Sequence, residues 1–142
     1  FILAESADGR LQGFACAHLW HEREAYAWDV ETTVYCAPDC VGQGVGGRLY
    51  RALLALLKKQ GYYNAFALVT GSNKQSNVFH KALGFKKMAT ERHTGYKFGQ
   101  WLDLDYWVMP LREDDKEPQP VRKKLTEEEM EEALRGSSGM RR

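Results

Sequence analysis

Four glycines fall within the six residues Gly42–Gly47 (GQGVGG), between a strand-like run and a helix-like one. The preceding segment, Tyr26–Ala37, is rich in aromatic and β-branched residues, which favour a strand. After the loop, leucines from Leu49 to Leu57 recur at helical spacing. Glycines let the backbone approach a ligand closely, and the unpaired N–H groups of a first helical turn attract an anion. This junction therefore predicts a strand–loop–helix unit that holds a pyrophosphate group.

The glycine loop could belong to three kinds of nucleotide-binding site. It fits the dinucleotide pattern G-x-G-x-x-G through Gly42, Gly44 and Gly47, but that fold needs an acidic residue about 20 residues further on. The corresponding strand end, Ala65–Gly71, carries none, which makes the dinucleotide interpretation weak. A P-loop needs Lys and then Ser or Thr after its last glycine, and here Arg48 follows instead. The third kind, an acyl-CoA loop, depends on the sequence around it.

The segments around the loop predict one α/β domain over residues 1–112. Strands are expected at Phe1–Glu5, Leu11–His21, Tyr26–Ala37, Ala65–Thr70, Phe85–His93 and Leu102–Leu111, and helices at Leu49–Lys59 and Asn73–Leu83. Ser72 is expected to cap the second helix, and Gly61 and Gly84 supply left-handed stops for the two helices. The short apolar run Ala65–Thr70 suits a buried parallel strand.

The chain changes character after Leu111. Residues 113–121 are charged and contain proline, which is typical of a linker or tail. Thr126–Glu129 is a capping-box pattern and predicts a short acidic helix that reaches about Arg135. The composition of Gly136–Arg142 is typical of disorder. We therefore expect residues 113–142 to form a charged, mostly disordered C-terminal tail.

Composition restricts the partners of the chain. The formal net charge is +1, so no large basic surface invites nucleic acid. No apolar run approaches the ~20 residues of a membrane helix, and no export signal opens the chain. Three cysteines, an odd number without a disulfide framework, favour a reducing compartment such as the cytoplasm. Cys36 and Cys40 have no further ligand nearby in sequence, so no metal site is expected.

Three blocks of sequence carry a resemblance beyond the glycine loop. They are Val30–Tyr35 (VETTVY), Asn73–Phe85 and Gly95–Asp103 (GYKFGQWLD), of which the first and last are more specific than the loop. With the order of strands and helices, they resemble the phosphinothricin N-acetyltransferase family of the GNAT superfamily over most of residues 1–112. The loop departs from the family at Val41, where Gln or Arg is usual, so we expect weaker CoA affinity.

The resemblance implies the GNAT acyl-CoA N-acyltransferase fold. This is an α/β fold with a mixed, mostly antiparallel sheet and flanking helices, and here it would lack its N-terminal strand and helices. The chain also opens abruptly, because Phe1 begins an apolar strand-like run and exposed termini are rarely built this way. We therefore expect that a segment upstream of Phe1 is missing from this sequence.

The resemblance also implies a function. It is the direct transfer of acetyl from acetyl-CoA to the primary amine of a small amino-acid-like acceptor, such as phosphinothricin or methionine sulfoximine. The implied cofactor-binding residues are Val34, Tyr35, Cys36, Gly42, Gln43, Gly44, Val45, Gly46 and Gly47. The implied acceptor contacts are Glu24, Ala25, Tyr26, Glu31 and Asn73. Asn73 could equally cap its helix, and a homodimer is implied by the resemblance alone.

Amine acetylation needs a base for the ammonium, a donor for the thioester oxygen and a proton for the leaving thiolate. Glu31 is the candidate base, because a carboxylate in an aromatic and β-branched strand is costly to bury without a role. By resemblance, its counterpart lies in the acceptor site. His80 is the candidate general acid, because many GNAT enzymes carry a tyrosine there that protonates the thiolate. Cys36 as a nucleophile paired with His80 is disfavoured, because direct transfer needs no acyl-enzyme.

Several alternatives stay open at this point. Glu31 could be an exposed carboxylate, and His80 could be a surface histidine. The chain could acetylate a different amine, or it could be a module that binds acyl-CoA without catalysis. Val41 and the missing N-terminal part favour the binding module slightly, whereas Glu31 and the block Gly95–Asp103 favour an enzyme.

Overall fold

The computed structural model describes residues 1–138, and for residues 136–138 it describes the backbone alone. Its elements are β1 (Ile2–Glu5), β2 (Leu11–Leu19), the 3₁₀ turn η1 (Glu24–Tyr26), β3 (Asp29–Cys36), the 3₁₀ turn η2 (Pro38–Cys40), α1 (Val45–Gln60), β4 (Asn64–Thr70), α2 (Lys74–Leu83), β5 (Lys86–Lys97), β6 (Gln100–Pro110) and α3 (Glu127–Ser138). The disorder expected for residues 139–142 lies outside the described residues.

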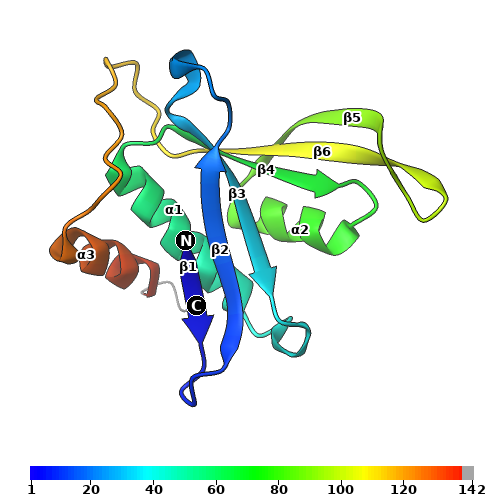
Figure 1. The fold of residues 1–142 in the computed structure, drawn as a ribbon, viewed down its shortest axis with the longest axis horizontal. Helices are drawn as coiled ribbons and strands as arrows, with labels where there is room; N and C mark the ends of the chain where they lie inside the picture. The colour runs from blue at the N-terminus through cyan, green and yellow to red at the C-terminus, as the bar shows by residue number, and fades with distance from the viewer. Residues whose placement is uncertain (139–142) are drawn as a thin grey trace.

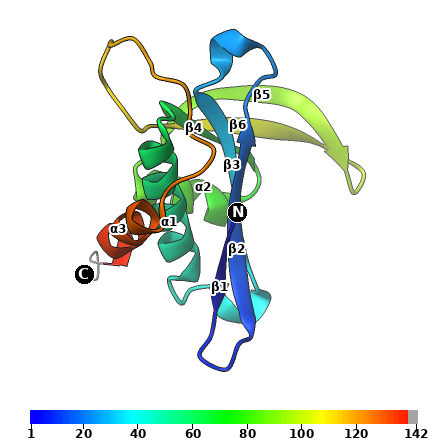
Figure 2. The ribbon, with the colours of Figure 1, turned by 60° about the vertical axis from the view of Figure 1, so that its left-hand side comes forward.

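The described strands form one six-stranded sheet in the order β1-β2-β3-β4-β6-β5 (Figure 1). Among these strands, β3 and β4 run parallel, and every other neighbouring pair is antiparallel. Helices α1 and α3 lie on one side of the sheet, and no α-helix of residues 1–138 covers the other side (Figures 1 and 2). The structure confirms the predicted mixed, mostly antiparallel sheet with flanking helices.

Strands β3 and β4 begin side by side and then diverge (Figure 1). Their ladder holds for three registered pairs, of which Glu31↔Phe66 is the last. Beyond that pair, β3 stays paired with β2 as far as Cys36, and β4 stays paired with β6 as far as Thr70. A gap therefore opens between β3 and β4, while β2 and β6 remain paired with the outer edges of these two strands.

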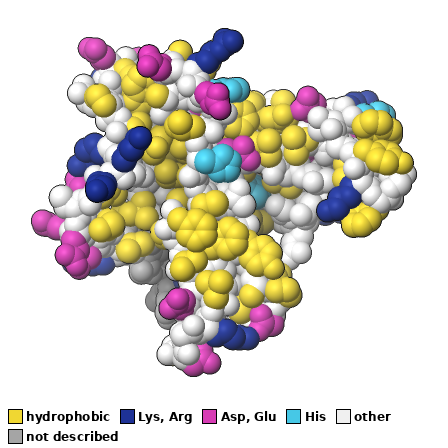
Figure 3. Space-filling view, viewed as in Figure 1, with side chains coloured by type: hydrophobic (Ala, Val, Ile, Leu, Met, Phe, Trp, Pro, Cys, Tyr) yellow, Lys and Arg dark blue, Asp and Glu magenta, His cyan; other side chains and the backbone are white. Residues whose placement is uncertain are grey.

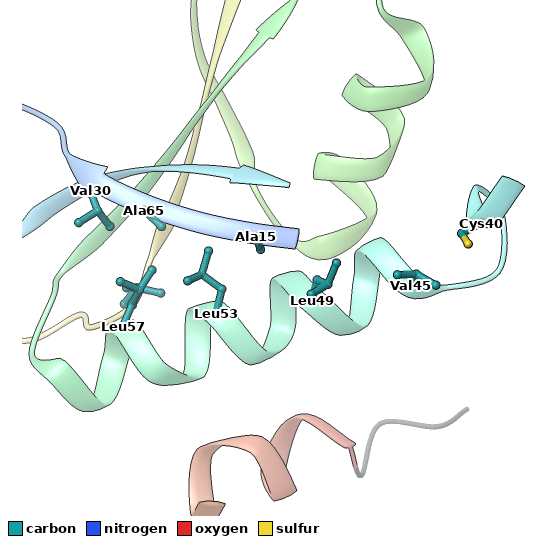
Figure 4. Packing of buried hydrophobic residues seen from close by; sticks show 9 residues of the cluster. Ala15, Val30, Cys40, Val45, Leu49, Leu53, Leu57 and Ala65 are labelled. Carbon is teal, nitrogen blue, oxygen red and sulfur yellow. The ribbon is translucent and has the colours of Figure 1, made fainter. Parts of the chain in front are cut away.

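Helix α1 supplies the core on the covered side of the sheet. Its inward face follows the helical leucine spacing that the sequence predicts. Figure 4 shows this packing, which involves Leu49, Leu53, Leu57, Ala15, Val30 and Ala65. Gly61 ends the helix in a left-handed conformation with φ +100°, which confirms the predicted stop.

Helix α2 is capped by Asn73 and not by Ser72, so the second of the two caps that the sequence offered is the one that forms. The helix begins at Lys74, and the Asn73 side chain accepts a hydrogen bond from the N–H of Ser76 at 3.1 Å. Asparagine and serine are comparable caps, so the exact start of the helix decides between them. Gly84 ends the helix with φ +102°, as predicted.

Two strand boundaries differ from the predicted ones. β3 begins at Asp29 and not at Tyr26, because the three residues from Glu24 turn as η1. β5 continues to Lys97 instead of ending near His93, and it pairs with β6 down to the turn. The two strands therefore form a long hairpin that projects from the body of the domain (Figure 1).

The uncovered face of the sheet carries a row of aromatic side chains. Phe1 stacks on Phe14, and Phe14 stacks on Tyr35, with ring centroids 5.3 and 5.6 Å apart. Figure 3 shows hydrophobic side chains gathered over β1–β3 and again at the far end of the β5–β6 hairpin. The exposed aromatic residues near the hairpin turn are Tyr96, Phe98 and Trp101.

The C-terminal tail lies against the domain, which differs from the mostly disordered tail expected from its composition. Helix α3 packs on α1, on the side away from the sheet (Figure 4). Before it, the indole N–H of Trp28 donates to the carbonyl of Gln119 at 2.8 Å, and the N–H of Arg122 donates to the carbonyl of Gln60 at 2.9 Å. These partners are far away in sequence, so the local charge pattern does not reveal them.

The start of α3 is the predicted capping box. The N–H of Glu129 donates to Thr126 Oγ1 at 3.2 Å, and the N–H of Thr126 donates to the Glu129 carboxylate at 2.9 Å. The helix runs to Ser138, whereas the sequence predicted an end near Arg135. Within the described residues, no helix combines the length and the apolar character needed to cross a membrane.

Candidate functional site

A cavity of about 440 Å³ opens where β3 and β4 diverge. Its walls come from the end of β3, the glycine loop with the first turn of α1, and the start of α2. The lining residues are Val34, Tyr35, Cys36, Cys40, Val41, Gly42, Gly44, Val45, Gly46, Gly47, Asn73, Gln75, Ser76 and Phe79. The cavity thus brings together the predicted cofactor-binding residues, with the exception of Gln43. The Gln43 side chain turns back and donates to the carbonyl of Asp39 at 2.8 Å.

The glycine loop presents the start of α1 to this cavity. Gly42 and Gly44 have φ values of +81° and +77°, which glycine adopts without strain. Gly44 is the N-cap residue and provides no side-chain cap, so the first N–H groups of α1 are open to a ligand. A Cβ atom at Gly46 would stand 3.0 Å from Cys36 Sγ and 3.4 Å from the Phe79 ring. The loop can therefore keep its shape beside the cavity only if Gly46 stays without a side chain.

Two arginines on α1 add positive charge to the same loop, and sequence reasoning missed both. A Cβ at Gly44 would lie 3.7 Å from Arg48 Nη1, and one at Gly47 would lie 3.3 Å from Arg51 Nη1. Arg51 Nε is buried, and within residues 1–138 it has no hydrogen-bond partner. A phosphate oxygen is the kind of acceptor that such a group needs. Both arginines could have been recognised in the sequence, since they follow the glycine loop closely.

The end of β3 offers unpaired backbone groups to the cavity. At the two ends of the β2–β3 ladder, the N–H of Ala37 donates to Gln12 and the N–H of Trp20 donates to the carbonyl of Asp29. Odd-numbered residues of β3 therefore bond to β2, and because the edges alternate along a strand, Val34 and Cys36 point their amides into the gap. Free amides at this edge could hold an acyl carbonyl or an extended ligand, and that role of the strand stays a prediction.

Cys36 lines the cavity, but its environment does not make it a nucleophile. Burial, and next the neighbouring Cys40, raise the pKa of the Cys36 thiol above its usual value of 9.0. The thiol therefore stays neutral near pH 7. In the described part of the chain, His80 makes no bond to it, so the structure does not form the Cys–His pair that the sequence left open.

Glu31 projects from β3 on the uncovered face, opposite the side chains that face α1. It belongs to the last β3–β4 pair, so it stands beside the gap. Its side chain is 30% exposed, and one carboxylate oxygen lies 3.5 Å from Nε2 of His18 on β2. A half-exposed carboxylate beside an open strand edge can accept a proton from a group that arrives from this face.

His80 does not line the cavity and is not a surface residue; it is buried, with 5% exposure. Its Nδ1 lies 2.8 Å from the carbonyl of Ser76, and its Nε2 lies 3.2 Å from the hydroxyl of Tyr50. Burial lowers the pKa of His80 below 6.5, although the bond to Ser76 raises it in part. The imidazole is therefore neutral, with Nδ1–H donating to the carbonyl of Ser76 and Nε2 turned toward Tyr50. The alternative of a surface histidine is wrong, and the role of His80 as a general acid stays a prediction.

The residues predicted to contact the acceptor are divided between two places. Asn73 lines the cavity while it caps α2. Glu24, Ala25 and Tyr26 form η1, next to the start of β3, and all three are exposed. None of these three lines the cavity, so their role as acceptor contacts stays a prediction.

Four further cavity residues were missed because their position depends on the tertiary fold. Gln75, Ser76 and Phe79 come from the first two turns of α2, after the predicted contact Asn73, and Cys40 is buried in η2. Helical spacing from Asn73 could have suggested Ser76, because residues three apart share a helix face. Within residues 1–138, no group of three or more His, Cys, Asp or Glu side chains could hold a metal ion.

Comparison with known proteins gives a family match over most of the chain. Residues 1–105 match the family described as acetyltransferase (GNAT) domain. The phosphinothricin N-acetyltransferase of Streptomyces viridochromogenes is 37% identical over 120 residues, which is 84% of this chain and 65% of that protein. The L-methionine sulfoximine/L-methionine sulfone acetyltransferase of Pseudomonas aeruginosa is 33% identical over 78% of this chain and 64% of that protein.

A solved structure is similar over the same region. The phosphinothricin acetyltransferase from Sinorhizobium meliloti, in complex with AcCoA, matches with a TM-score of 0.79 and 31% identity, covering 85% of this chain and 66% of that one. The chain thus spans just under two thirds of the length of the curated relatives it matches, 65% and 64% in the two cases above.

Proposed function

Since this chain belongs to the GNAT acetyltransferase family, we propose that it transfers acetyl from acetyl-CoA directly to the primary amine of a small amino-acid-like acceptor. One observation carries the proposal. A single cavity joins the uncapped, glycine-rich start of α1 to the unpaired edge of β3. The first suits a pyrophosphate and the second suits an extended amide-bearing arm with a thioester at its end.

The cavity residues fit the parts of acetyl-CoA in sequence. The open N–H groups at the start of α1 and the guanidinium groups of Arg48 and Arg51 would hold the phosphates. The backbone of Val34 and Cys36 would pair with the pantetheine arm, and a free amide there would donate to the thioester oxygen as it gains charge. Val41, although it lines the cavity, contributes no side-chain donor, so the affinity rests on the backbone.

The acceptor would approach from the uncovered face, where Glu31 stands. The carboxylate would take a proton from the ammonium, and the free amine would then attack the carbonyl carbon held in the gap. Exposed residues of η1, with Glu24 and Tyr26, would contact the rest of the acceptor. The names of relatives that act on phosphinothricin and on methionine sulfoximine support an acceptor of this size and type.

The leaving thiolate needs a proton, and His80 could supply one only through Ser76. The Ser76 hydroxyl lines the cavity and lies 3.4 Å from Nδ1 of His80. We therefore propose that His80 acts indirectly at most. Turnover and its pH profile in His80→Phe test this role, and an unchanged profile removes it.

A direct assay tests the proposed function. Purified full-length protein is incubated with acetyl-CoA and a panel that contains phosphinothricin, methionine sulfoximine, common amino acids and a polyamine, and the released CoA thiol is measured. Thiol release with the first two acceptors supports the proposal. Thiol release with other amines alone means that the acceptor belongs to a different class. Measurable CoA binding without any thiol release supports the non-catalytic binding module.

We also propose a homodimer, as the family resemblance implies. The exposed aromatic residues at the hairpin turn, Tyr96, Phe98 and Trp101, offer an apolar surface for such a contact. Size-exclusion chromatography with light scattering tests this, because a mass of one chain at micromolar concentration contradicts it.

A further inference from the structure

A chain of buried polar contacts runs from α2 through α1 to the point where β3 and β4 separate. Nδ1 of His80 lies 2.8 Å from the carbonyl of Ser76, and Nε2 lies 3.2 Å from the hydroxyl of Tyr50. That hydroxyl lies 2.7 Å from Thr32 Oγ1, which in turn donates to the carbonyl of Phe66 at 3.0 Å. Thr32 and Tyr50 are 4% and 0% exposed, so water hardly competes for these bonds.

Donor and acceptor roles along this chain follow from the groups. A carbonyl can only accept, so His80 gives its Nδ1 hydrogen to Ser76, and Thr32 gives its hydrogen to Phe66. Tyr50 then has one hydrogen and two acceptors, and the shorter separation favours Thr32. Burial raises the pKa of Tyr50 to about 12, so the hydroxyl keeps its hydrogen near pH 7. Tyr50 therefore donates to Thr32, and Thr32 donates to the carbonyl of Phe66, so the 3.2 Å contact between Nε2 of His80 and the Tyr50 hydroxyl carries no hydrogen while the imidazole is neutral.

The carbonyl of Phe66, where these hydrogen bonds end, lies at a decisive point of the sheet. Phe66 and Glu31 form the last registered pair of β3 and β4, and beyond it each strand keeps only its outer partner. The Thr32 hydroxyl therefore secures the last pair before the gap. Tyr50 ties that hydroxyl to α1, the helix whose first turn forms the opposite wall of the cavity.

A polar link here is unusual for this core. Besides Thr32 and His80, the buried polar or charged residues of the described chain include Asp105, which lies elsewhere on β6. The neighbours of Tyr50 in the core are apolar, namely Ala67, Val69, Phe85 and Trp107. Apolar side chains could fill this place without requiring matched donors and acceptors, so the hydroxyl groups have a role other than packing.

We propose that Thr32 and Tyr50 are positioning residues for acetyl-CoA, whose hydroxyl groups fix where β3 leaves β4 and thereby aim the free amides of Val34 and Cys36. The inference rests on the proposed function, because it concerns the same cavity. Without these hydroxyls, the last pair loosens, and the strand edge and the start of α1 no longer converge on one ligand. Affinity for CoA then falls by more than the loss of stability explains.

The test compares hydroxyl removal inside and outside this chain of bonds. Thr32→Val and Tyr50→Phe remove the two hydroxyls, and Thr32→Ser keeps one. Thr90→Val is the control, since Thr90 donates a partly buried bond of 2.6 Å to Asp105 on the β5–β6 hairpin, and neither residue lines the cavity. Tyr62→Phe is the second control, because the Tyr62 hydroxyl has no hydrogen-bond partner among the described residues.

Three quantities are measured for each full-length variant: the Kd for CoA by calorimetry, KM and kcat by thiol release, and the urea midpoint of unfolding. We expect Thr32→Val and Tyr50→Phe to weaken CoA binding by about tenfold, and Thr32→Ser to remain within about twofold of wild type. Thr90→Val should lower the urea midpoint with an unchanged Kd. In the double variant with Thr32→Val and Tyr50→Phe, the Kd for CoA should rise by less than the product of the two single factors, because both hydroxyls belong to one chain of bonds.

The outcomes separate the two proposals. An unchanged Kd in Thr32→Val and Tyr50→Phe, with stability lowered as in Thr90→Val, overturns the positioning role and leaves the proposed function standing. If the wild-type protein binds CoA but releases no thiol, the proposed enzymatic activity is overturned. The comparison of Kd values among the variants still decides the positioning role. Wild type that does not bind CoA overturns both.

Discussion

The two faces of the sheet achieve recognition by different means. On the covered face, the cavity presents backbone groups, which are the open amides at the start of α1 and the free edge of β3. On the uncovered face, the proposed chemistry depends on side chains, foremost Glu31 with His18 3.5 Å away. Backbone groups survive most substitutions, whereas a side chain can be changed in one step. Cofactor binding and acceptor chemistry should therefore respond separately to mutation.

The largest expected effect comes from Glu31→Gln, which removes the proposed base without changing its size. Loss of a general base typically costs 10²–10⁴-fold, so we expect kcat to fall by roughly that factor. The Kd for CoA should stay the same, because Glu31 does not line the cavity. Glu5→Gln on β1 is the control, as it removes an exposed carboxylate away from the gap. Full activity in Glu31→Gln would contradict the role of Glu31 as the base and, with it, the proposed acceptor chemistry on the uncovered face.

Gly46→Ala tests the covered face. The added methyl would stand 3.0 Å from Cys36 Sγ and push the wall of the cavity inward. We expect the Kd for CoA to rise by about tenfold, with kcat at saturation nearly unchanged. Gly9→Ala is the control, because Gly9 has φ +81° with open space around it, so alanine there costs about 1 kcal/mol of stability without touching the cavity. Equal Kd values for the two variants would contradict a cofactor site at this loop.

A smaller effect is expected from Arg51→Ala. Its guanidinium lies over Gly47, and its buried Nε has no hydrogen-bond partner among residues 1–138. Removing this charge should weaken CoA binding by about three- to fivefold at low salt, and the difference should shrink as salt is added. Arg112→Ala removes the same charge from an ion pair with Asp114 and serves as the control. A salt-independent loss would indicate altered packing instead of phosphate binding.

The smallest effect concerns the pH dependence of stability, through His80. Burial lowers its folded-state pKa below 6.5, so below that pH the unfolded chain binds a proton that the folded protein does not. The unfolding free energy should therefore fall as the pH drops through 6.5. Tyr50, which faces Nε2, stays neutral in this range because its pKa is about 12.

Urea midpoints at about pH 5.5 and 7.5 check this expectation. His80→Phe should reduce the difference between the two midpoints, whereas His21→Phe, which removes an exposed histidine, serves as the control. An unchanged difference in His80→Phe means that another group controls the acid sensitivity.

Features that depend on neighbours in sequence were predicted well. The glycine stops at Gly61 and Gly84 and the capping box from Thr126 to Glu129 all appear in the structure, because each depends on a few consecutive residues. Alternation and helical spacing also identified the individual strands and helices, whereas the mixed sheet that they form was implied by the family resemblance. For the cap of α2 the sequence left Ser72 and Asn73 open, because they are similar caps, and the structure has Asn73.

Features that depend on distant neighbours were not predictable. In the sequence, His80 could be a general acid or a surface histidine, yet the fold buries it, and this burial lowers its pKa below 6.5. The charged segment around Arg122 finds partners at Gln60, 62 positions away in the chain. The divergence of β3 and β4 is also invisible in the sequence, because both strands have ordinary β composition. The glycines and Glu31 pointed to the candidate site, whereas the shape of its cavity came from the fold.

The unpaired edge of β3 has a consequence for the behaviour of the protein in solution. A free strand edge can recruit the edge of another chain and start aggregation. Here the edge lies inside the molecule, with the first turn of α1 and Phe79 of α2 on the walls of its cavity. The free stretch is also short, since β3 ends at Cys36, five residues after its last pair with β4. Under the proposed function acetyl-CoA would occupy this stretch, so cofactor binding would also shield the edge from pairing with a second copy of the chain.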